Sequence, residues 1–258
     1  SLHLQPGGGR SSSQVLPFFN LEGAGQGLIM AVGWTGEWSA DFSVPGDELG
    51  EEQTTDIVRG ARVDSREWDD DGDNTAVGFN VPDPRIDVSY EHDWIQIRDF
   101  TPGGQVTYTI YDYVGGHALW GPVTGPVDSH GDGWVSSNLF QTDLIPGNYI
   151  TTVDEATGEE VSVLIRDVNL DYISVEEDRV FGTAEPNTTI ELNIGENHDQ
   201  GFNLPVAVDD TGYWEVDLTA AGHPIDSYRY ANAYLYDAEG DSIIAQSPWI
   251  DAEISTDN

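Results

Sequence analysis

A stretch of eleven residues occurs twice in this chain, and this repeat limits the folds that the chain can adopt. Residues 32–42 align without a gap to residues 208–218, at a separation of 176 positions (208 − 32 = 176). In each copy a Thr-Gly pair favours a tight turn, because glycine tolerates a positive φ angle. Apolar residues then follow at alternate positions, which is typical of a strand with one buried face. The repeat therefore predicts a chain built from similar β modules.

A second repeat, at an offset of 84 residues (171 − 87 = 84), gives the size of one module. Residues 87–110 and 171–194 each predict two strands around a turn that contains proline. A hairpin with an acidic, glycine-containing loop follows each copy, and residues 68–79 predict a third hairpin. We therefore predict an all-β chain of three tandem antiparallel immunoglobulin-like β-sandwich modules, the first lacking its opening strand. The predicted modules are residues 1–82, 83–167 and 168–249, followed by a C-terminal strand over residues 250–258.

The two ends of the sequence carry complementary strand patterns. Leu2 and Leu4 match the second strand of a module, which leaves the first module with an open sheet edge that could accept another strand. Residues 250–258 resemble residues 86–93, where the next module opens. We expect this C-terminal segment to act as an assembly strand whose alternate side chains enter an incomplete module. These side chains are Ile250, Ala252 and Ile254.

Two interpretations of these ends remain open. In the first, the C-terminal strand of one copy completes the first module of the next copy, which gives an extracellular filament or surface layer that assembles head to tail. In the second, the segment is a window from a longer array, and neighbouring modules of the same polypeptide supply the strands. A different class of function is also open, namely a carbohydrate-binding or adhesin module array of a larger secreted protein.

The charge of the chain excludes several classes of partner. Asp and Glu number 47 against 9 basic residues, all of them Arg, for a formal net charge of −38. Such a surface repels nucleic acids and anionic lipids. The chain has no Cys, which excludes disulfides and thiolate metal sites, and no apolar stretch of about 20 residues that could cross a bilayer. We expect an extracellular or cell-surface protein with no nucleic-acid partner and no membrane insertion.

Three turn motifs point to a family of tandem domains. They are Gly-x-Ala-x-Pro at residues 182–186, Thr-Gly-x-Trp at 211–214 and Asp-x-x-Gly-Asp at 237–241. With modules of this length, they resemble the motifs of bacterial immunoglobulin-like domains of secreted and surface proteins. In the middle module, residues 130–134 carry one extra residue before Trp134. The resemblance implies a two-sheet antiparallel sandwich for each module, and a role in spacing, adhesion or assembly.

Acidic residues cluster in two of the predicted hairpin loops. Carboxylate oxygens are ligands that Ca²⁺ prefers, but the first loop departs from the EF-hand pattern because Asn74 replaces its glycine. The alternative, which we favour, is a solvated turn, since Asp and Gly are common in tight turns. The acids beside the central turns, Asp128 and Asp209 among them, have the same two interpretations. The candidate calcium ligands are Asp69, Asp71 and Asp73 in the first loop, and Asp237, Glu239 and Asp241 in the second.

Four tryptophans fall outside the alternating core positions, and exposed rings of this kind fill pockets in partner proteins or stack on sugars. We favour contact with another module over a glycan. In contrast, Trp38, Trp134 and Trp214 are assigned to the cores. The candidate surface-contact rings are Trp34, Trp94, Trp120 and Trp249.

No pattern in the sequence predicts an enzyme. The chain has no Gly-x-Ser-x-Gly, no Ser-x-x-Lys and no phosphate-binding loop, and its six His residues lack the spacing of a zinc site. Asn187 begins an Asn-Thr-Thr glycosylation acceptor on a predicted exposed turn. We therefore expect a structural or binding protein with no catalytic residue and no required cofactor, Ca²⁺ being the one candidate ion.

Overall fold

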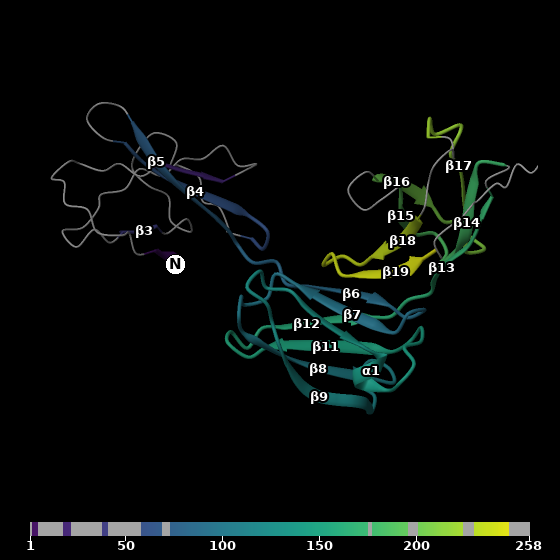
Figure 1. Cartoon of the computed structure of the whole chain (residues 1–258), viewed down its shortest axis with the longest axis horizontal. Helices are drawn as coiled ribbons and strands as arrows, with labels where there is room; N and C mark the ends of the chain where they lie inside the picture. Colours follow the sequence, from purple (N-terminus) through teal and green to yellow (C-terminus); the bar gives the residue numbers. More distant parts are fainter. Residues whose placement is uncertain are drawn as a thin grey trace, which may run out of the picture. The chain divides into compact units, whose positions relative to one another are not determined.

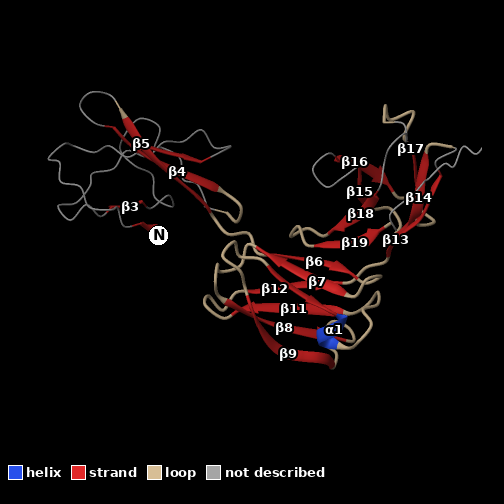
Figure 2. Ribbon diagram, viewed as in Figure 1, coloured by secondary structure: helices blue, strands red, loops and turns tan. Residues whose placement is uncertain are grey.

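In the part of the computed structural model that can be described, all the regular elements are β-strands apart from one helix of four residues (Figure 1; Figure 2). The chain divides into two compact units, residues 1–83 and residues 84–258. The residues that the structure describes are 2–4, 18–21, 38–40, 58–68, 73–174, 177–195, 201–223 and 230–247. The sheets confirm the all-β prediction, while the division into three modules stays a prediction.

The described part of the first unit contains two small antiparallel sheets. The β4–β5 hairpin of the larger sheet confirms the hairpin predicted over residues 68–79. Strand β3 starts at Trp38, in the strand predicted after the first Thr-Gly turn. The smaller sheet pairs β1 (Leu2–Leu4) with β3 (Trp38–Ala40), and the larger has the order β2 (Phe18–Leu21), β4 (Arg62–Trp68), β5 (Asn74–Asn80).

The second unit begins with two packed sheets, which we call the first sandwich. One sheet has the order β10-β7-β6 and the other the order β12-β11-β8-β9, and a one-turn helix follows β10. The β11–β12 hairpin is the acidic-loop hairpin that the sequence predicts. The elements are β6 (Arg85–Ser89), β7 (Trp94–Arg98), β8 (Gln105–Tyr111), β9 (Ala118–Pro126), β10 (Gly133–Ser136), α1 (Ser137–Phe140), β11 (Tyr149–Asp154) and β12 (Glu160–Leu164).

A second sandwich repeats this arrangement, with sheets β13-β14-β17 and β19-β18-β15-β16. Strands β8 and β15 start 84 residues apart (189 − 105 = 84), as the second repeat predicts. Each copy of that repeat holds three strands where two were predicted, because the segment before the proline turn folds into a hairpin, β6–β7 or β13–β14. The strands are β13 (Val168–Ser174), β14 (Arg179–Ala184), β15 (Thr189–Gly195), β16 (Gly201–Ala207), β17 (Tyr213–Asp217), β18 (Tyr230–Tyr236) and β19 (Ser242–Gln246).

The pairing of β1 differs from the pattern expected for Leu2 and Leu4. Their likeness to residues 189–193 predicts the position of β15, which pairs with β16 and β18. In the structure β1 pairs with β3, and the 176-residue offset matches β3 to β17, whose partner is β14. The strand of Leu2 and Leu4 therefore corresponds to β14. The partner of a strand depends on packing across the whole sheet, and the pattern of residues 1–5 alone does not determine it. Its role as an acceptor edge stays a prediction.

Alternating side chains build the core of each sandwich. In β8 the inward residues Val106, Tyr108 and Ile110 are buried, and in β15 the corresponding residues are buried as well. The buried side chains of both sandwiches belong to one contact cluster. The second unit therefore has a single hydrophobic core that continues from one sandwich into the other.

The extra residue before Trp134 changes the packing of the first sandwich. In the second sandwich Trp214 is 1% exposed and lies opposite Gly182, whose missing side chain leaves room for the indole ring. In the first sandwich Gly133 takes this inward position opposite Ile97, and Trp134 points outward with 55% exposure. A shift of one residue moves the side chains of a strand to the opposite face. The assignment of Trp134 to the core is therefore wrong, and that of Trp214 is confirmed.

Gly182→Ala should destabilise the second sandwich. The added methyl group would lie 2.0 Å from the carbonyl oxygen of Asn169 and 2.6 Å from Cζ2 of Trp214, so the strand or the indole ring must move. We expect the free energy of unfolding to fall by roughly 3 kcal/mol, the upper end of the usual cost of overpacking, in denaturant unfolding followed by tryptophan fluorescence. Gly125→Ala is the matched control, because its methyl group would meet the Tyr108 ring at 3.5 Å, an ordinary contact. Equal stability of the two variants would contradict this account.

Candidate functional site

Strands β6 and β19 join the two sandwiches edge to edge. They pair in parallel, with Ser242 opposite Asp87 and Ile243 opposite Val88. The result is one seven-stranded sheet in the order β10-β7-β6-β19-β18-β15-β16. Val88 and Ile243 are fully buried on the core side of this sheet, at 0% exposure each. The junction therefore links both the sheets and the cores of the two sandwiches.

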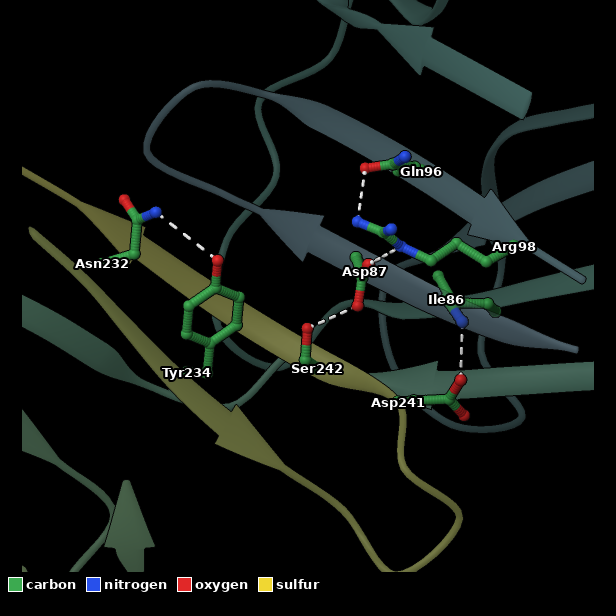
Figure 3. Close-up of polar contacts among 8 residues, drawn as sticks. All are labelled: Ile86, Asp87, Gln96, Arg98, Asn232, Tyr234, Asp241 and Ser242. Atoms are coloured by element: carbon green, nitrogen blue, oxygen red, sulfur yellow. Dashed lines mark hydrogen bonds and ion pairs between the residues drawn. The ribbon is translucent and has the colours of Figure 1, made fainter. Parts of the chain in front are cut away.

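A polar network closes this junction on the other face of the sheet (Figure 3). The Asp87 carboxylate accepts hydrogen bonds from the Ser242 hydroxyl and from Nε of Arg98, both at 2.6 Å. The backbone N–H of Ile86 donates to Oδ1 of Asp241, also at 2.6 Å. Burial of a carboxylate is costly unless it is hydrogen-bonded, and charge-assisted hydrogen bonds are the strong ones. Each edge strand thus satisfies buried polar groups of the other.

Asp241 is the electrostatically unusual member of the network. The residue is 2% exposed. Burial raises the pKa of its carboxyl group to about 7, and the neighbouring carboxylates of Asp237, Asp87 and Glu239 act in the same direction against the N–H of Ile86. Near neutral pH this group therefore exchanges between its protonated and ionised forms.

Two further side chains fix the short linker between the sandwiches, residues 165–167. The Tyr90 hydroxyl lies 3.0 Å from Oδ1 of Asp167 in the linker, and 2.7 Å from the carbonyl oxygen of Val168, the first residue of β13. Arg166 donates to two backbone carbonyl oxygens at the end of β18, at 3.5 and 2.6 Å. The linker is thus bonded to the first sandwich through Tyr90 and to the second through Arg166.

The strand register places five side chains in one row across the outer face of the seven-stranded sheet. Tyr236 lies opposite Ser242, Ser242 opposite Asp87, Asp87 opposite Gln96, and Gln96 opposite Trp134. The rings at the two ends are exposed, 41% for Tyr236 and 55% for Trp134, whereas the middle of the row is polar. We call this surface the shared face, because both sandwiches contribute to it.

Open hollows lie along the shared face on both sandwiches. One is bounded by Gln96, Trp134 and the loop that precedes β10. The other lies beside Tyr234 and Tyr236, whose rings are nearly parallel, with 8° between their planes and centroids 5.9 Å apart. Burial raises the pKa of Tyr236 to about 12, so its hydroxyl group stays protonated. The polar side chains that line this second hollow include Arg98, Glu191, Asn193 and Asn203.

The structure exchanges the predicted roles of two tryptophans. Trp94 is only 8% exposed, because the indole ring of Trp134 stacks on it with centroids 4.6 Å apart, and its Nε1 donates to Gln246 at 3.3 Å. The prediction of Trp94 as a surface ring is therefore wrong. Trp120 is half-buried and meets Phe140 edge-on at 5.8 Å. Trp34 and Trp249, together with the side chain of Trp38, lie outside the described residues.

The tyrosines of β18 were not predicted as site residues, although the sequence holds a signal for them. Tyr230, Tyr234 and Tyr236 share the alternate positions of β18 with Asn232, and the residues between these positions are Ala or Leu. Such spacing puts the small apolar residues toward the core and the rings on the opposite face. The four surface rings predicted from the sequence are all tryptophans, so this stripe is not among them.

Three Asp-x-x-Gly turns of the second unit, at residues 128–131, 209–212 and 237–240, share one geometry. In the β18–β19 turn, Oδ1 of Asp237 accepts the backbone N–H groups of Glu239 and Asp241, at 3.1 and 2.9 Å. Asp128 and Asp209 accept the N–H groups two and four residues later in the same way. The glycine of each turn has a positive φ angle, which few other residues adopt without strain. These carboxylates hold the turns together, as the solvated-turn interpretation requires.

The calcium ligands proposed from the sequence are not brought together where the structure describes them. Asp241 directs its carboxylate to Ile86, whereas Asp237 caps its own turn. Over the described ranges, no group of three or more His, Asp or Glu side chains has the arrangement of a metal site. Asp73 is exposed, and Asp69 and Asp71 lie outside these ranges, so calcium binding at the first loop stays a prediction.

The remaining sequence candidates have different outcomes. Asn187 is exposed in the turn between β14 and β15 with a φ angle of 61°, which confirms the predicted turn, while its glycosylation stays a prediction. The assembly-strand residues Ile250, Ala252 and Ile254 lie outside the described residues. In the part of the chain that the structure describes, no helix is long and apolar enough to cross a membrane.

Comparison with known proteins finds likeness in structure alone. No protein-family model matches the sequence, and no curated protein matches it. Among solved structures, the chain is similar to a tetra-tandem repeat from the extending region of a large adhesion protein, with 16% identity, coverage of 91% of this chain and 66% of that chain, and a TM-score of 0.23. A Ca²⁺-stabilised adhesin with which an Antarctic bacterium binds ice gives 17% identity, coverage of 91% and 65%, and a TM-score of 0.22.

A further similar structure belongs to a 1.5-MDa bacterial ice-binding adhesin, with 18% identity, coverage of 94% of this chain and 87% of that chain, and a TM-score of 0.20. The chain thus spans slightly less than two thirds of the length of the first two of these structures, at 66% and 65%. At TM-scores of this size the overall arrangements differ, so these likenesses carry no argument about function.

Asp241→Asn should change how stability depends on pH. The asparagine keeps an oxygen that accepts the N–H of Ile86, but it removes a carboxyl group whose pKa in the folded protein, about 7, exceeds its ordinary value of 3.8. The folded wild type therefore holds this proton more tightly than the unfolded chain does, and loses free energy of unfolding as pH rises from about 4 to about 7. We expect the variant to gain about 4 kcal/mol relative to the wild type between pH 4 and pH 8, at about 1.4 kcal/mol for each unit of the pKa difference, measured by urea unfolding.

Asp210→Asn is the control for this prediction, because it removes one negative charge from an exposed residue that is not among the carboxylates acting on Asp241. The informative quantity is the difference between variant and wild type at each pH, since the many other carboxyl groups titrate in both proteins. A difference that stays constant from pH 4 to pH 8 would show that the pKa of Asp241 is not raised in the folded protein.

Proposed function

We propose that this chain is a structural segment of tandem sandwiches from a secreted or cell-surface adhesive protein, in which it holds other parts of the molecule at a fixed separation. The observation that carries the proposal is the parallel pairing of β6 with β19, through which two sandwiches share one sheet and one core. Tandem domains are expected to move relative to each other unless their interface is extensive and apolar. A shared sheet removes most of that freedom.

Three further features support a spacer. The linker is only three residues long, 165–167, and it is bonded on both sides through Tyr90 and Arg166. The net charge of −38 favours solubility and opposes association between copies. The turns are short and fixed by their own Asp side chains. Together these features describe a stiff, highly soluble connector.

The predicted filament rests on residues 250–258, which lie outside the described residues. The junction between the two sandwiches works in another way, because β6 and β19 are edge strands of sandwiches that are already complete. Edge pairing of this kind needs no donated strand. This pairing supports a segment of an array, and adhesion by the larger protein remains part of the proposal. Strand donation by residues 250–258 stays a prediction.

The rigid connection can be tested by spin-label distance measurements, because the chain has no native Cys. Tyr113→Cys in the first sandwich and Asp210→Cys in the second are both exposed labelling positions. We expect a single narrow distance distribution, as narrow as that of a control pair within the first sandwich, Tyr113→Cys with Ser129→Cys. A distribution much broader than the control would overturn the proposed spacer.

Removal of the linker contacts should broaden this distribution. Tyr90→Phe keeps the ring but removes the hydroxyl group that meets Val168, and Arg166→Met keeps the apolar stem but removes the guanidinium group. We expect the double variant to show a broader distribution between the sandwiches and an unchanged control distribution. A double variant as narrow as the wild type would show that the sheet pairing alone fixes the junction.

A further inference from the structure

We propose that the shared face binds a neutral polysaccharide, with Tyr236 and Trp134 as the stacking rings and the polar side chains between and beside them as hydrogen-bonding groups. This inference goes beyond the spacer function, which requires no ligand. It rests on the arrangement of the two exposed rings, on their rigid support and on the chemistry of the surface that separates them.

The first observation is the spacing of the rings. Tyr236 and Trp134 end a row that crosses five neighbouring strands, β18, β19, β6, β7 and β10. With about 4.8 Å between neighbouring strands, the two positions are about 19 Å apart. A separation of this size suits an extended chain of several sugar rings and exceeds the length of a single monosaccharide. The ligand is therefore a polymer.

The second observation is that the rings are held in place before any ligand arrives. Trp134 stacks on Trp94 at 4.6 Å with 25° between the planes, and Gln246 anchors Trp94 by a hydrogen bond. Tyr236 lies nearly parallel to Tyr234 on the same strand. Rings fixed on strands lose little conformational entropy on binding, which favours affinity.

The third observation is the chemistry between the rings. Arg98 donates one hydrogen bond to Gln96 and another to Asp87, and Asn193 is hydrogen-bonded to Asn203 at the edge of the second hollow. Amide groups of this kind both donate hydrogen bonds to hydroxyl groups and accept them, whereas the guanidinium group only donates. The faces of sugar rings are apolar while their edges carry hydroxyl groups, which matches a surface of exposed aromatic rings flanked by polar side chains.

The charge of the protein decides between classes of ligand. A net charge of −38 repels nucleic acids and acidic polysaccharides. A folded protein partner that covered this face would have to desolvate Arg98, whose side chain is 51% exposed, together with the Glu191 and Asp87 carboxylates. A neutral polymer leaves these charges hydrated at its rim, so it is the ligand that the observations favour.

The test is binding of the full chain to soluble neutral polysaccharides, namely a mixed-linkage β-glucan, a mannan, a xylan and a dextran, in affinity electrophoresis followed by calorimetry. Heparin is the acidic control polymer. We expect at least one neutral polymer to bind and heparin not to bind. Binding to none of the four, or binding of heparin alone, would overturn the proposal.

Variants of the two rings test the site itself. We expect Tyr236→Ala and Trp134→Ala each to raise the dissociation constant tenfold or more. Tyr172→Ala, which removes an equally exposed ring from β13, at 57% exposure, should leave the dissociation constant unchanged. Because Trp134 covers Trp94, the thermal unfolding of each variant is measured in parallel, so that a loss of binding is distinguished from a loss of folding.

The outcomes separate this proposal from the spacer function. Unchanged affinity in both ring variants would exclude the shared face as the binding site, even if a polysaccharide binds elsewhere. A narrow spin-label distribution without any polysaccharide binding would leave the spacer standing and overturn the present inference. Capture of a protein partner that Tyr236→Ala abolishes would show that the face serves a different class of ligand.

Discussion

The parallel pairing of β6 with β19 is the contact on which the arrangement of the second unit depends. An edge strand presents unpaired N–H and C=O groups and tends to pair with another strand. Here the two edges belong to the first strand of one sandwich and the last strand of the next. Asp87, Ser242 and Asp241 satisfy the polar groups at this contact, while Val88 and Ile243 merge the cores beneath it. One pairing thus joins the two sandwiches and protects two edges.

The acidic residues of this chain have at least two structural roles. At Asp128, Asp209 and Asp237 the carboxylate accepts backbone N–H groups and fixes a tight turn. At the junction the carboxylates are buried and bonded to the neighbouring strand, and the cost of this burial appears in the raised pKa of Asp241. A formal net charge of −38 is thus partly the result of local backbone requirements, although its effect on partners is global.

The shared face exists only because the two sandwiches are joined. Trp134 belongs to the first sandwich and Tyr236 to the second, so neither sandwich alone would carry both rings on one surface. The polar groups between them come from both sandwiches as well. The rigid junction and the proposed binding surface are therefore two consequences of the same strand pairing, which gives a spacer a means of contact along its length.

The sequence by itself determined the strand periodicity, the 84-residue repeat, the acidic-loop hairpins and the inward position of Trp214, because these depend on local turn residues and on alternation within single strands. Only the tertiary structure decided which edges pair, since β6 and β19 meet across about 155 residues through backbone groups that every residue carries. It also decided that Trp134 is exposed and that Trp94 is buried beneath it. A single extra residue before β10 turns the side chains of this strand to the opposite face, and the pattern of the strand alone fits either face.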